Sequence, residues 1–188
     1  FEVCGHKWAD LSEYGYGVSL LNDCKYGHDI KDNVMRLTLL KSAVIPNEDA
    51  DREVHHFTYS LFPHSGDFRS GRVVQEAYFL NQPLTARLVE KQAGKLPAEM
   101  SFAFVDAENV VMEVVKKSEY DDALILRVHE CYNQRTKTSI CTYLPIESVC
   151  ECDLEERETL ETLKAEGNRF AFTIKPYEIK TFKIALKK

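Results

Sequence analysis

The sequence predicts an all-β protein with the architecture of a β-sandwich. Short runs of alternating apolar and polar residues recur along the 188 residues, and turn-forming residues separate them. Hydrophobic residues make up 44% of the chain and charged residues 29%, so the chain can bury a core. Many short strands punctuated by turns are typical of sandwich folds.

Eleven segments have the length and the alternation of strands. In chain order they are 1–3, 17–21, 34–40, 56–62, 101–105, 110–115, 123–129, 138–143, 148–154, 169–174 and 179–186. Within 124–129 the even-numbered residues are predicted to face a core and the odd-numbered residues, Ile125 included, to point outward. The alternation in 179–186 is imperfect and Pro176 precedes it, which favours a strand at a sheet edge.

Two further segments lack this alternation. In 72–80, Val73, Ala77 and Leu80 follow the spacing of one helix face, which predicts a short helix. Residues 155–165 are charged and have no broad apolar face, so we expect an exposed loop there.

The composition changes near residue 107. Before this point lie seven of the eight glycines, five of the six histidines and the single tryptophan. Residues 91–97 contain Gln, Gly, Lys and Pro and are predicted to be a polar connector. We therefore predict two parts, 1–107 and 108–188, of which the first has the turn-rich, aromatic character of a contact surface.

Charge and cysteine content exclude several classes of protein. The net charge is −6 and no basic run could neutralise a phosphate backbone, so nucleic acid is not an expected partner. No apolar run approaches the ~18 residues of a membrane span. The six cysteines are too few for a disulfide framework, so we expect reduced thiols and a cytoplasmic protein. Because the chain opens at Phe1 without a leader, we expect it to be part of a longer protein.

The densest polar cluster lies at residues 22–29, beside glycines. Its candidate binding residues are Asn22, Asp23, Lys25 and Tyr26. Carboxylate and amide groups can bind sugar hydroxyls, while an aromatic face covers the C–H face of the ring. Asparagine and aspartate near glycine are also ordinary turn residues, so the alternative is a structural hairpin turn.

Neither a metal site nor a catalytic residue is predicted. Each of the six histidines lacks an Asp or His two residues later. His64 is the most noteworthy of them, because it is predicted to lie in a turn. Nucleophile-elbow, dinucleotide-binding and Walker motifs are missing from the sequence.

Several stretches resemble one known family. Leu-Leu-Asn-Asp-Cys-Lys-Tyr-Gly over 20–27 follows His-Lys-Trp-Ala-Asp-Leu-Ser-Glu over 6–13, and the chain closes on Lys-Pro-Tyr-Glu-Ile-Lys-Thr-Phe over 175–182. These stretches closely resemble the C-terminal β region of glycoside hydrolase family 38, the α-mannosidases, in its cytosolic and bacterial branch. The resemblance covers nearly the whole chain.

The resemblance implies a larger parent enzyme that removes α-linked mannose with retention, using zinc and an Asp nucleophile in an N-terminal catalytic domain. It implies no cofactor in this chain, with zinc expected in the missing catalytic domain, which would be its partner together with a mannose-containing glycan. Residues 1–107 would belong to a galactose-mutarotase-like super-sandwich, and 108–188 would form a small terminal β-sandwich.

The resemblance also implies a role for the polar cluster at the edge of the substrate pocket. Asn22 and Asp23 would bind sugar hydroxyls, Tyr26 would stack or hydrogen-bond, and Lys25 would neutralise a carboxylate. The alternative is a turn that pins the β region to the catalytic domain.

Two other functions stay open at this point. One is an independent carbohydrate-binding module that grips a glycan with Trp8, Tyr14 and Tyr16; the other is an interaction domain. If the chain is the non-catalytic portion of a larger enzyme, its uncovered surfaces should lead to self-association.

Overall fold

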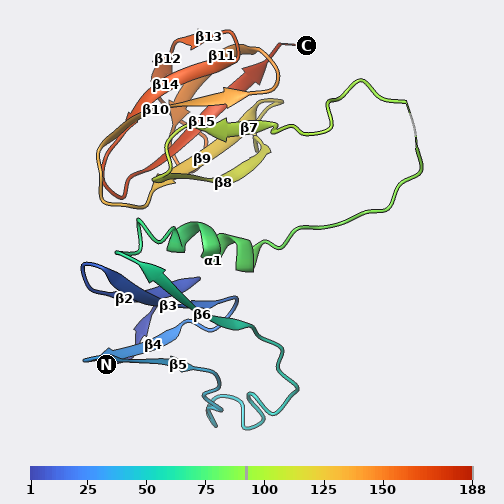
Figure 1. Ribbon diagram of the computed structural model, residues 1–188. Coiled ribbons are helices and arrows are strands. Elements are labelled where there is room, and N and C mark those ends of the chain that lie inside the picture. The colour runs from blue at the N-terminus through green and yellow to red at the C-terminus, as the bar shows by residue number, and fades with distance from the viewer. Residues whose placement is uncertain (92, 188) are drawn as a thin grey trace. The chain divides into compact units, whose positions relative to one another are not determined.

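The computed structural model describes residues 1–91 and 93–187, so Gln92 of the predicted connector, and Lys188, lie outside the described residues. Within this part of the chain, fifteen strands and one helix are formed, which confirms the all-β prediction. The chain divides into two compact units, Phe1–Glu90 and Lys91–Lys188 (Figure 1). The assignment of 1–107 and 108–188 to two kinds of sandwich stays a prediction.

The first unit contains two antiparallel three-stranded sheets and the helix. One sheet has the order β2-β3-β6 and the other β1-β4-β5. The elements are β1 (Val3–Cys4), β2 (Trp8–Ser12), β3 (Tyr16–Asn22), β4 (Gly27–Lys31), β5 (Val34–Thr38), β6 (Tyr59–Ser65) and α1 (Val73–Asn81).

Helix α1 covers one face of the β2-β3-β6 sheet and forms a small core with it. Val73 and Ala77 of the helix are fully buried against Leu21 of β3. Trp8 and Phe68 stack beside them with ring centroids 5.2 Å apart. The predicted helix over 72–80 is thereby confirmed with a shift of one residue.

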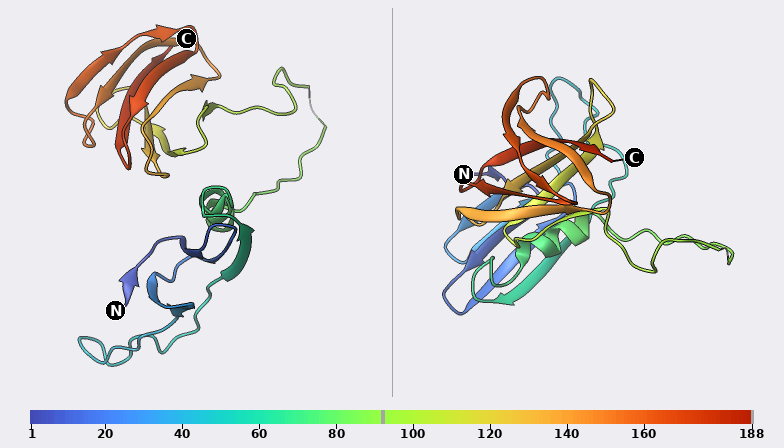
Figure 2. Two further views of the ribbon diagram at one scale, coloured as in Figure 1. Left: turned by 60° about the vertical axis from the view of Figure 1, so that its left-hand side comes forward. Right: turned by 90° about the horizontal axis from the view of Figure 1, so that it is seen from above.

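The second unit is a two-layered antiparallel sandwich (Figure 2). Five strands have the order β12-β11-β15-β9-β8, and four have the order β13-β14-β10-β7. Their bounds are β7 (Ala103–Val105), β8 (Val110–Lys117), β9 (Leu124–Glu130), β10 (Thr136–Thr142), β11 (Ile146–Cys152), β12 (Thr159–Leu163), β13 (Ala165–Glu166), β14 (Arg169–Ile174) and β15 (Ile179–Leu186).

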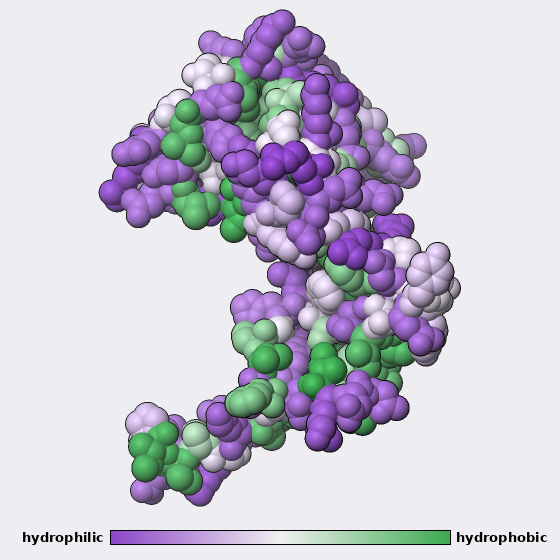
Figure 3. Space-filling view, turned by 90° about the vertical axis from the view of Figure 1, so that its left-hand side faces the viewer, coloured by the Kyte–Doolittle hydropathy of each residue, from purple (hydrophilic) through white to green (hydrophobic). Residues whose placement is uncertain are grey.

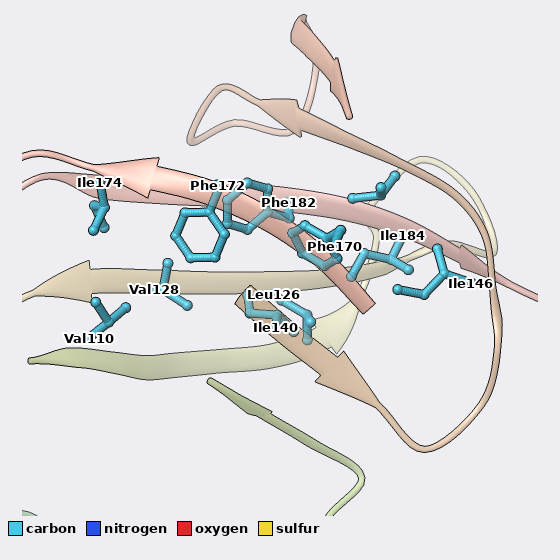
Figure 4. Packing of buried hydrophobic residues seen from close by; sticks show 11 residues of the cluster. Val110, Leu126, Val128, Ile140, Ile146, Phe170, Phe172, Ile174, Phe182 and Ile184 are labelled. Carbon is cyan, nitrogen blue, oxygen red and sulfur yellow. The ribbon is translucent and has the colours of Figure 1, made fainter. Parts of the chain in front are cut away.

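The core of the second unit fills the space between its two sheets (Figure 4). Phe182 of β15 packs against Phe170 and Phe172 of β14, with ring centroids 5.0 and 4.7 Å apart. Burying one such side chain contributes about 1.5–3 kcal/mol before the entropy cost of ordering it. The buried members of the cluster are Val110, Leu126, Val128, Ile140, Ile146, Val149, Phe170, Phe172, Ile174, Phe182 and Ile184.

The exposed loop predicted over 155–165 is wrong, because this segment contains β12 and β13. Strand β12 pairs only with β11 at the edge of its sheet, and most of its residues are exposed. An edge strand held by backbone hydrogen bonds needs no apolar face, so the charged sequence concealed it.

The edge position predicted for 179–186 is also wrong, since β15 lies between β11 and β9. Its polar residues have partners: the Lys180 ammonium lies 2.5 Å from the Glu151 carboxylate. The Thr181 hydroxyl accepts a hydrogen bond from Arg127 Nε at 3.0 Å. Paired polar groups can occupy a central strand without a large desolvation cost.

Ile125 is fully buried, although the alternation places it on the outer face of β9. Its register neighbours are Lys116 and Lys183. The loop after β11 reaches this face, because the Lys116 ammonium lies 2.9 Å from the carboxylate of Glu156. The second face of the sheet therefore carries a local covered area that periodicity does not reveal.

Candidate functional site

The predicted cluster lies where β3 ends and the chain turns into β4. Asn22 is fully buried, and its side-chain oxygen accepts a hydrogen bond from the Lys25 N–H at 3.1 Å. Its backbone oxygen accepts another from Asn81 Nδ2 at 2.9 Å. Asn22 thus shapes the turn and ties it to helix α1.

The Asp23 carboxylate is engaged by the backbone. The Thr58 N–H donates to both of its oxygens at 2.9 Å, and the Asp23 N–H donates to the Thr58 carbonyl at 3.2 Å. The N–H of Thr58 holds the pKa of this carboxyl below its ordinary value of 3.8. Asp23 therefore fixes the segment that leads into β6.

Lys25 and Tyr26 face different aromatic neighbours. The Lys25 ammonium lies 4.9 Å from the centroid of the Phe57 ring, which stacks on Tyr59 at 6.4 Å. The Tyr26 ring lies 4.4 Å from the His6 ring, and the residue is 43% exposed. Each of the predicted binding residues has its own set of neighbours, and their contact with a sugar stays a prediction.

An apolar hollow of about 240 Å³ lies beside this cluster. It is lined by Leu20, Leu37, Leu39 and Tyr59. Leu61, which is 68% exposed, stands opposite Leu20 in the sheet register. We call these five residues the apolar face. Figure 3 shows hydrophobic side chains gathered on the surface of the first unit, in the lower part of the view.

A buried polar group on the other face of the same sheet was missed by the sequence interpretation. The Ser19 hydroxyl donates to Asp10 Oδ1 at 2.5 Å, and His64 Nε2 lies 2.7 Å from the same oxygen. His64 lies in strand β6, so its predicted turn position is wrong. Alternate polar residues on β2, β3 and β6 were the available signal, because cross-strand pairing brings Asp10 opposite Ser19.

This trio resembles a Ser-His-Asp set in composition but not in arrangement. The Ser19 hydroxyl donates to Asp10, and a single nitrogen of His64, Nε2, faces both the serine oxygen at 3.3 Å and the aspartate oxygen at 2.7 Å, whereas a catalytic histidine bridges the two groups through different nitrogens. Ser19 is fully buried, and the backbone at Gly17 and Gly71 approaches the His64 ring so closely that a Cβ atom would lie 2.3 or 2.5 Å from it. We therefore assign the trio to the structure of the first unit.

The second unit has its own buried carboxylate, Glu130, which is 1% exposed. It accepts hydrogen bonds from Asn109 Nδ2 at 2.8 Å and from the N–H groups of Tyr132 and Tyr177 at 2.8 and 2.9 Å. Burial alone would raise the pKa of this carboxyl. The hydrogen bonds outweigh burial and hold the pKa below its ordinary value of 4.5.

Residues 1–91 and 93–187 contain neither a cluster of metal ligands nor a helix that could span a membrane. This part of the chain has no group of three or more His, Cys, Asp or Glu residues that could hold a metal ion. The side chains do not fit a zinc site, so no chemical step through zinc is assigned to them. No helix in the same ranges is long and apolar enough to cross a membrane.

Two models of one family match the chain in sequence. The glycosyl hydrolases family 38 C-terminal domain matches residues 1–49, and the family 38 C-terminal beta sandwich domain matches residues 109–182. Together they take in more than half of the chain. The chain belongs to the C-terminal β region of glycosyl hydrolase family 38.

Curated proteins with similar sequences carry the name α-mannosidase. The chain is 38% identical to human Alpha-mannosidase 2C1 and 36% identical to Alpha-mannosidase G of Dictyostelium discoideum. It is 32% identical to an alpha-mannosidase of Saccharomyces cerevisiae. The alignments include 97–99% of this chain but 17–19% of the relatives, so the chain spans less than a fifth of their length.

Solved structures show the same fold. A family 38 glycosyl hydrolase from Enterococcus faecalis superposes with a TM-score of 0.78 at 16% identity, over 98% of this chain and 23% of that one. An alpha-mannosidase from Enterococcus faecalis V583 gives 0.79 at 17% identity, over 98% and 21%. The predicted family and the predicted fold class are thereby confirmed.

Proposed function

We propose that the chain is a non-catalytic C-terminal portion of a zinc-dependent, retaining α-mannosidase, and that it supports the fold of the enzyme. The hydrolysis of α-linked mannose would take place in the catalytic domain of the longer polypeptide. The observation that carries the proposal is the apolar face of the first unit, in a chain that spans less than a fifth of its relatives.

The exposure of this face indicates a covering partner. Leu61 is 68% exposed and Tyr59 54%, next to the apolar hollow. Removing apolar surface from water contributes about 25 cal/mol per Å², so contact with another surface would be favourable. The partner we assign to the face is the preceding part of the mannosidase polypeptide.

The polar cluster would lie at the edge of the substrate pocket in the complete enzyme. Asn22 and Asp23 hold the turn through backbone hydrogen bonds. Tyr26 would then be free to approach a sugar, since it is 43% exposed. An Asp23→Ala change should disturb this loop and lower kcat/KM for a mannoside.

A second candidate is the independent carbohydrate-binding module. Tyr14 supports it, because this residue is fully exposed in the turn between β2 and β3. Trp8 is less suited to grip a glycan, since it packs against Phe68 in the core. Calorimetry with mannose and mannobiose on wild type and Tyr14→Ala would support this candidate if the variant loses binding.

A chimera tests the main proposal. This chain would replace the matching region of human Alpha-mannosidase 2C1, and cleavage of an aryl α-mannoside would be measured. The active chimera should lose folded yield when Leu61, on the edge strand β6, becomes lysine. The matched control is Leu160→Lys on β12, another edge strand, where the leucine is 60% exposed. Equal yields for the two variants would contradict the proposed partner surface.

The location proposed for the protein is the cytoplasm. All six cysteines are free, which suits a reducing compartment. The chain also resembles the cytosolic and bacterial branch of the family, and it is 38% identical to human Alpha-mannosidase 2C1. Fractionation of cells that produce the protein, with thiol labelling before lysis, would test this location.

A further inference from the structure

Strand β14 of the second unit has one edge that is covered over only part of its length. It lies between β10 and β13 in the four-stranded sheet. Strand β10 pairs with all of β14, whereas β13 pairs only with Arg169 and Phe170. Within the described ranges, residues 171–174 therefore have no strand beside them on the β13 side.

The backbone along this open edge offers hydrogen-bonding groups. The Thr142 N–H donates to the Asn168 carbonyl at 2.9 Å, and the register between β10 and β14 stays regular from there. The even-numbered residues of β14 therefore direct their N–H and C=O groups to β10. Ala171 and Thr173 direct theirs to the open side, where a further strand would accept and donate hydrogen bonds.

The open edge lacks the features that usually protect strand edges. Residues 171–174 are Ala-Phe-Thr-Ile, without a charge or a proline. Strand β8, at an edge of the other sheet, carries Lys116 and Lys117 and an irregular register instead. Charges and irregular pairing oppose the addition of another strand, so the edge of β14 is the better suited of the two to receive one.

A hollow of about 330 Å³ lies along this edge. Residues of both sheets line it, among them Phe172, Thr173, Lys137, Glu151, Glu161 and Lys180. The hollow thus lies on the open side of the sandwich, where a strand added to β14 would pass.

The charges around the hollow are not balanced within the chain. Glu151 and Glu161 stand opposite each other in the register of β11 and β12, and the Lys180 ammonium pairs with Glu151 at 2.5 Å. Within the described ranges, Glu161 and Lys137 take part in no ion pair, and both are exposed. A ligand that brings a cation to Glu161 and an anion to Lys137 would be complementary to this hollow.

An extended peptide satisfies both the open edge and the charges. Its backbone would pair with Ala171 and Thr173, and its side chains would alternate between the outer face of the sheet and the space between the sheets. A small zwitterion would match the charges but leave the edge unpaired. A neutral sugar would offer no charge to Glu161 or Lys137.

We propose that the open edge of β14 and the hollow beside it bind an extended peptide segment of another protein. The segment pairs antiparallel to β14, in line with β13. Its residues beside Thr173 on the outer face are acidic, toward Lys137, and a residue that points between the sheets is basic, toward Glu161. The site goes beyond the supporting role proposed above and does not depend on it.

The test is a fluorescence-anisotropy titration of the full chain with the labelled peptide acetyl-Thr-Val-Glu-Val-Glu-Lys-Thr-amide. A control peptide exchanges its acidic and basic residues. A second pair of peptides is N-methylated either on the two glutamates, whose N–H groups would point to β14, or on the two valines, whose N–H groups would point away.

Two protein variants complete the test. Glu161→Lys reverses the unpaired charge in the hollow. The matched control is Glu147→Lys, because Glu147 is an exposed glutamate of β11 that does not line the hollow. Melting temperatures of both variants should equal that of the wild type, as is usual for exposed charges.

The expected result is saturable binding of the first peptide. Methylation of the glutamates should weaken it by about tenfold or more, and methylation of the valines by less than about twofold. Glu161→Lys should weaken it by about fivefold and bind the exchanged peptide better than the wild type does, whereas Glu147→Lys should stay within about twofold.

Three results would overturn the proposal. The first is absence of saturable binding, and the second is an equal effect of the two methylations or of the two protein variants. The third is self-association in light scattering that Thr173→Pro abolishes, because a second copy of the chain would then be the occupant of the edge.

Discussion

The two units stabilise themselves in different ways. The second unit closes eleven buried apolar residues between two sheets. The first unit buries Leu21, Val73 and Ala77 with four partly buried neighbours, and it relies on the Asp10–Ser19–His64 group on the same face. On its other sheet face Leu20 is buried, but Tyr59 and Leu61 of the edge strand β6 stay exposed. The second unit therefore has a core that is closed within the unit, whereas the first unit, under the proposed function, would be completed by a partner surface.

The largest expected effect is a loss of unfolding free energy in the second unit alone. Phe182→Ala should destabilise the second unit by about 3–5 kcal/mol, because it leaves a cavity beside Phe170 and Phe172. Urea unfolding followed by far-UV circular dichroism would measure this loss.

The single tryptophan provides the control for this prediction. Trp8 lies in the first unit, so its fluorescence reports the unfolding of that unit. Its transition should stay within about 0.5 kcal/mol of the wild-type value in Phe182→Ala, as is usual for distant, independent sites. A Trp8 transition that moves together with the circular dichroism transition would show that the units unfold as one.

The polar group beneath α1 is the corresponding weak point of the first unit. His64→Ala should cost roughly 1–3 kcal/mol, because it removes a partner from the buried Asp10 carboxylate. Asp10→Asn and the double variant complete a cycle, with an expected coupling of about 0.5–3 kcal/mol between the two positions. Unfolding followed by Trp8 fluorescence would measure the free energies. If the losses in the two single variants add up to the loss in the double variant, the coupling is contradicted.

Acid should weaken the second unit through Glu130. The pKa of Glu130 is lowered on folding, so this carboxylate stabilises the folded state above pH 4.5 and stops doing so as pH falls through its folded pKa. Glu130→Gln should cost about 1–2 kcal/mol at pH 7, since an NH₂ group then faces a backbone N–H. The difference between wild type and variant should shrink at pH 3. A constant difference across this range, in urea unfolding, would rule out the titration of Glu130.

The smallest effect on stability is expected at the apolar face. Leu61→Lys should change the unfolding free energy of the isolated chain by less than about 0.5 kcal/mol, because the leucine is already 68% exposed. It should nevertheless reduce self-association, since it places a charge on the apolar face, which another copy of the chain would cover. Light scattering at high protein concentration measures this effect, with Leu160→Lys as the control that leaves association unchanged.

The sequence predicted most strands of the second unit, because their alternation matches one buried and one open sheet face. Strand β14 is found at the predicted residues, and β15 as well. Strand β12 was missed because hydrogen bonds to β11, rather than an apolar face, hold it in place. Strands β2 and β4 were missed since Trp8, Asp10 and the residues after Tyr26 give no clean period.

The turn at residues 22–26 was predictable in position but its contacts were not, and its role as a site stays a prediction. Asn22 and Asp23 predicted a turn, and the chain turns between the end of β3 at Asn22 and the start of β4 at Gly27. The hydrogen bond from the Thr58 N–H to the Asp23 carboxylate joins residues 35 positions apart, and a local sequence pattern does not reveal such a contact. The same limit hid the Asp10–His64 contact, which joins residues 54 positions apart.

Hydrogen–deuterium exchange on the intact chain tests the contrast between the units most directly. We expect slow exchange, limited by global unfolding, in β9, β10, β14 and β15, and exchange at least tenfold faster in β3 and β6. Equal protection in both groups of strands would contradict the claim that the first unit depends on a partner surface.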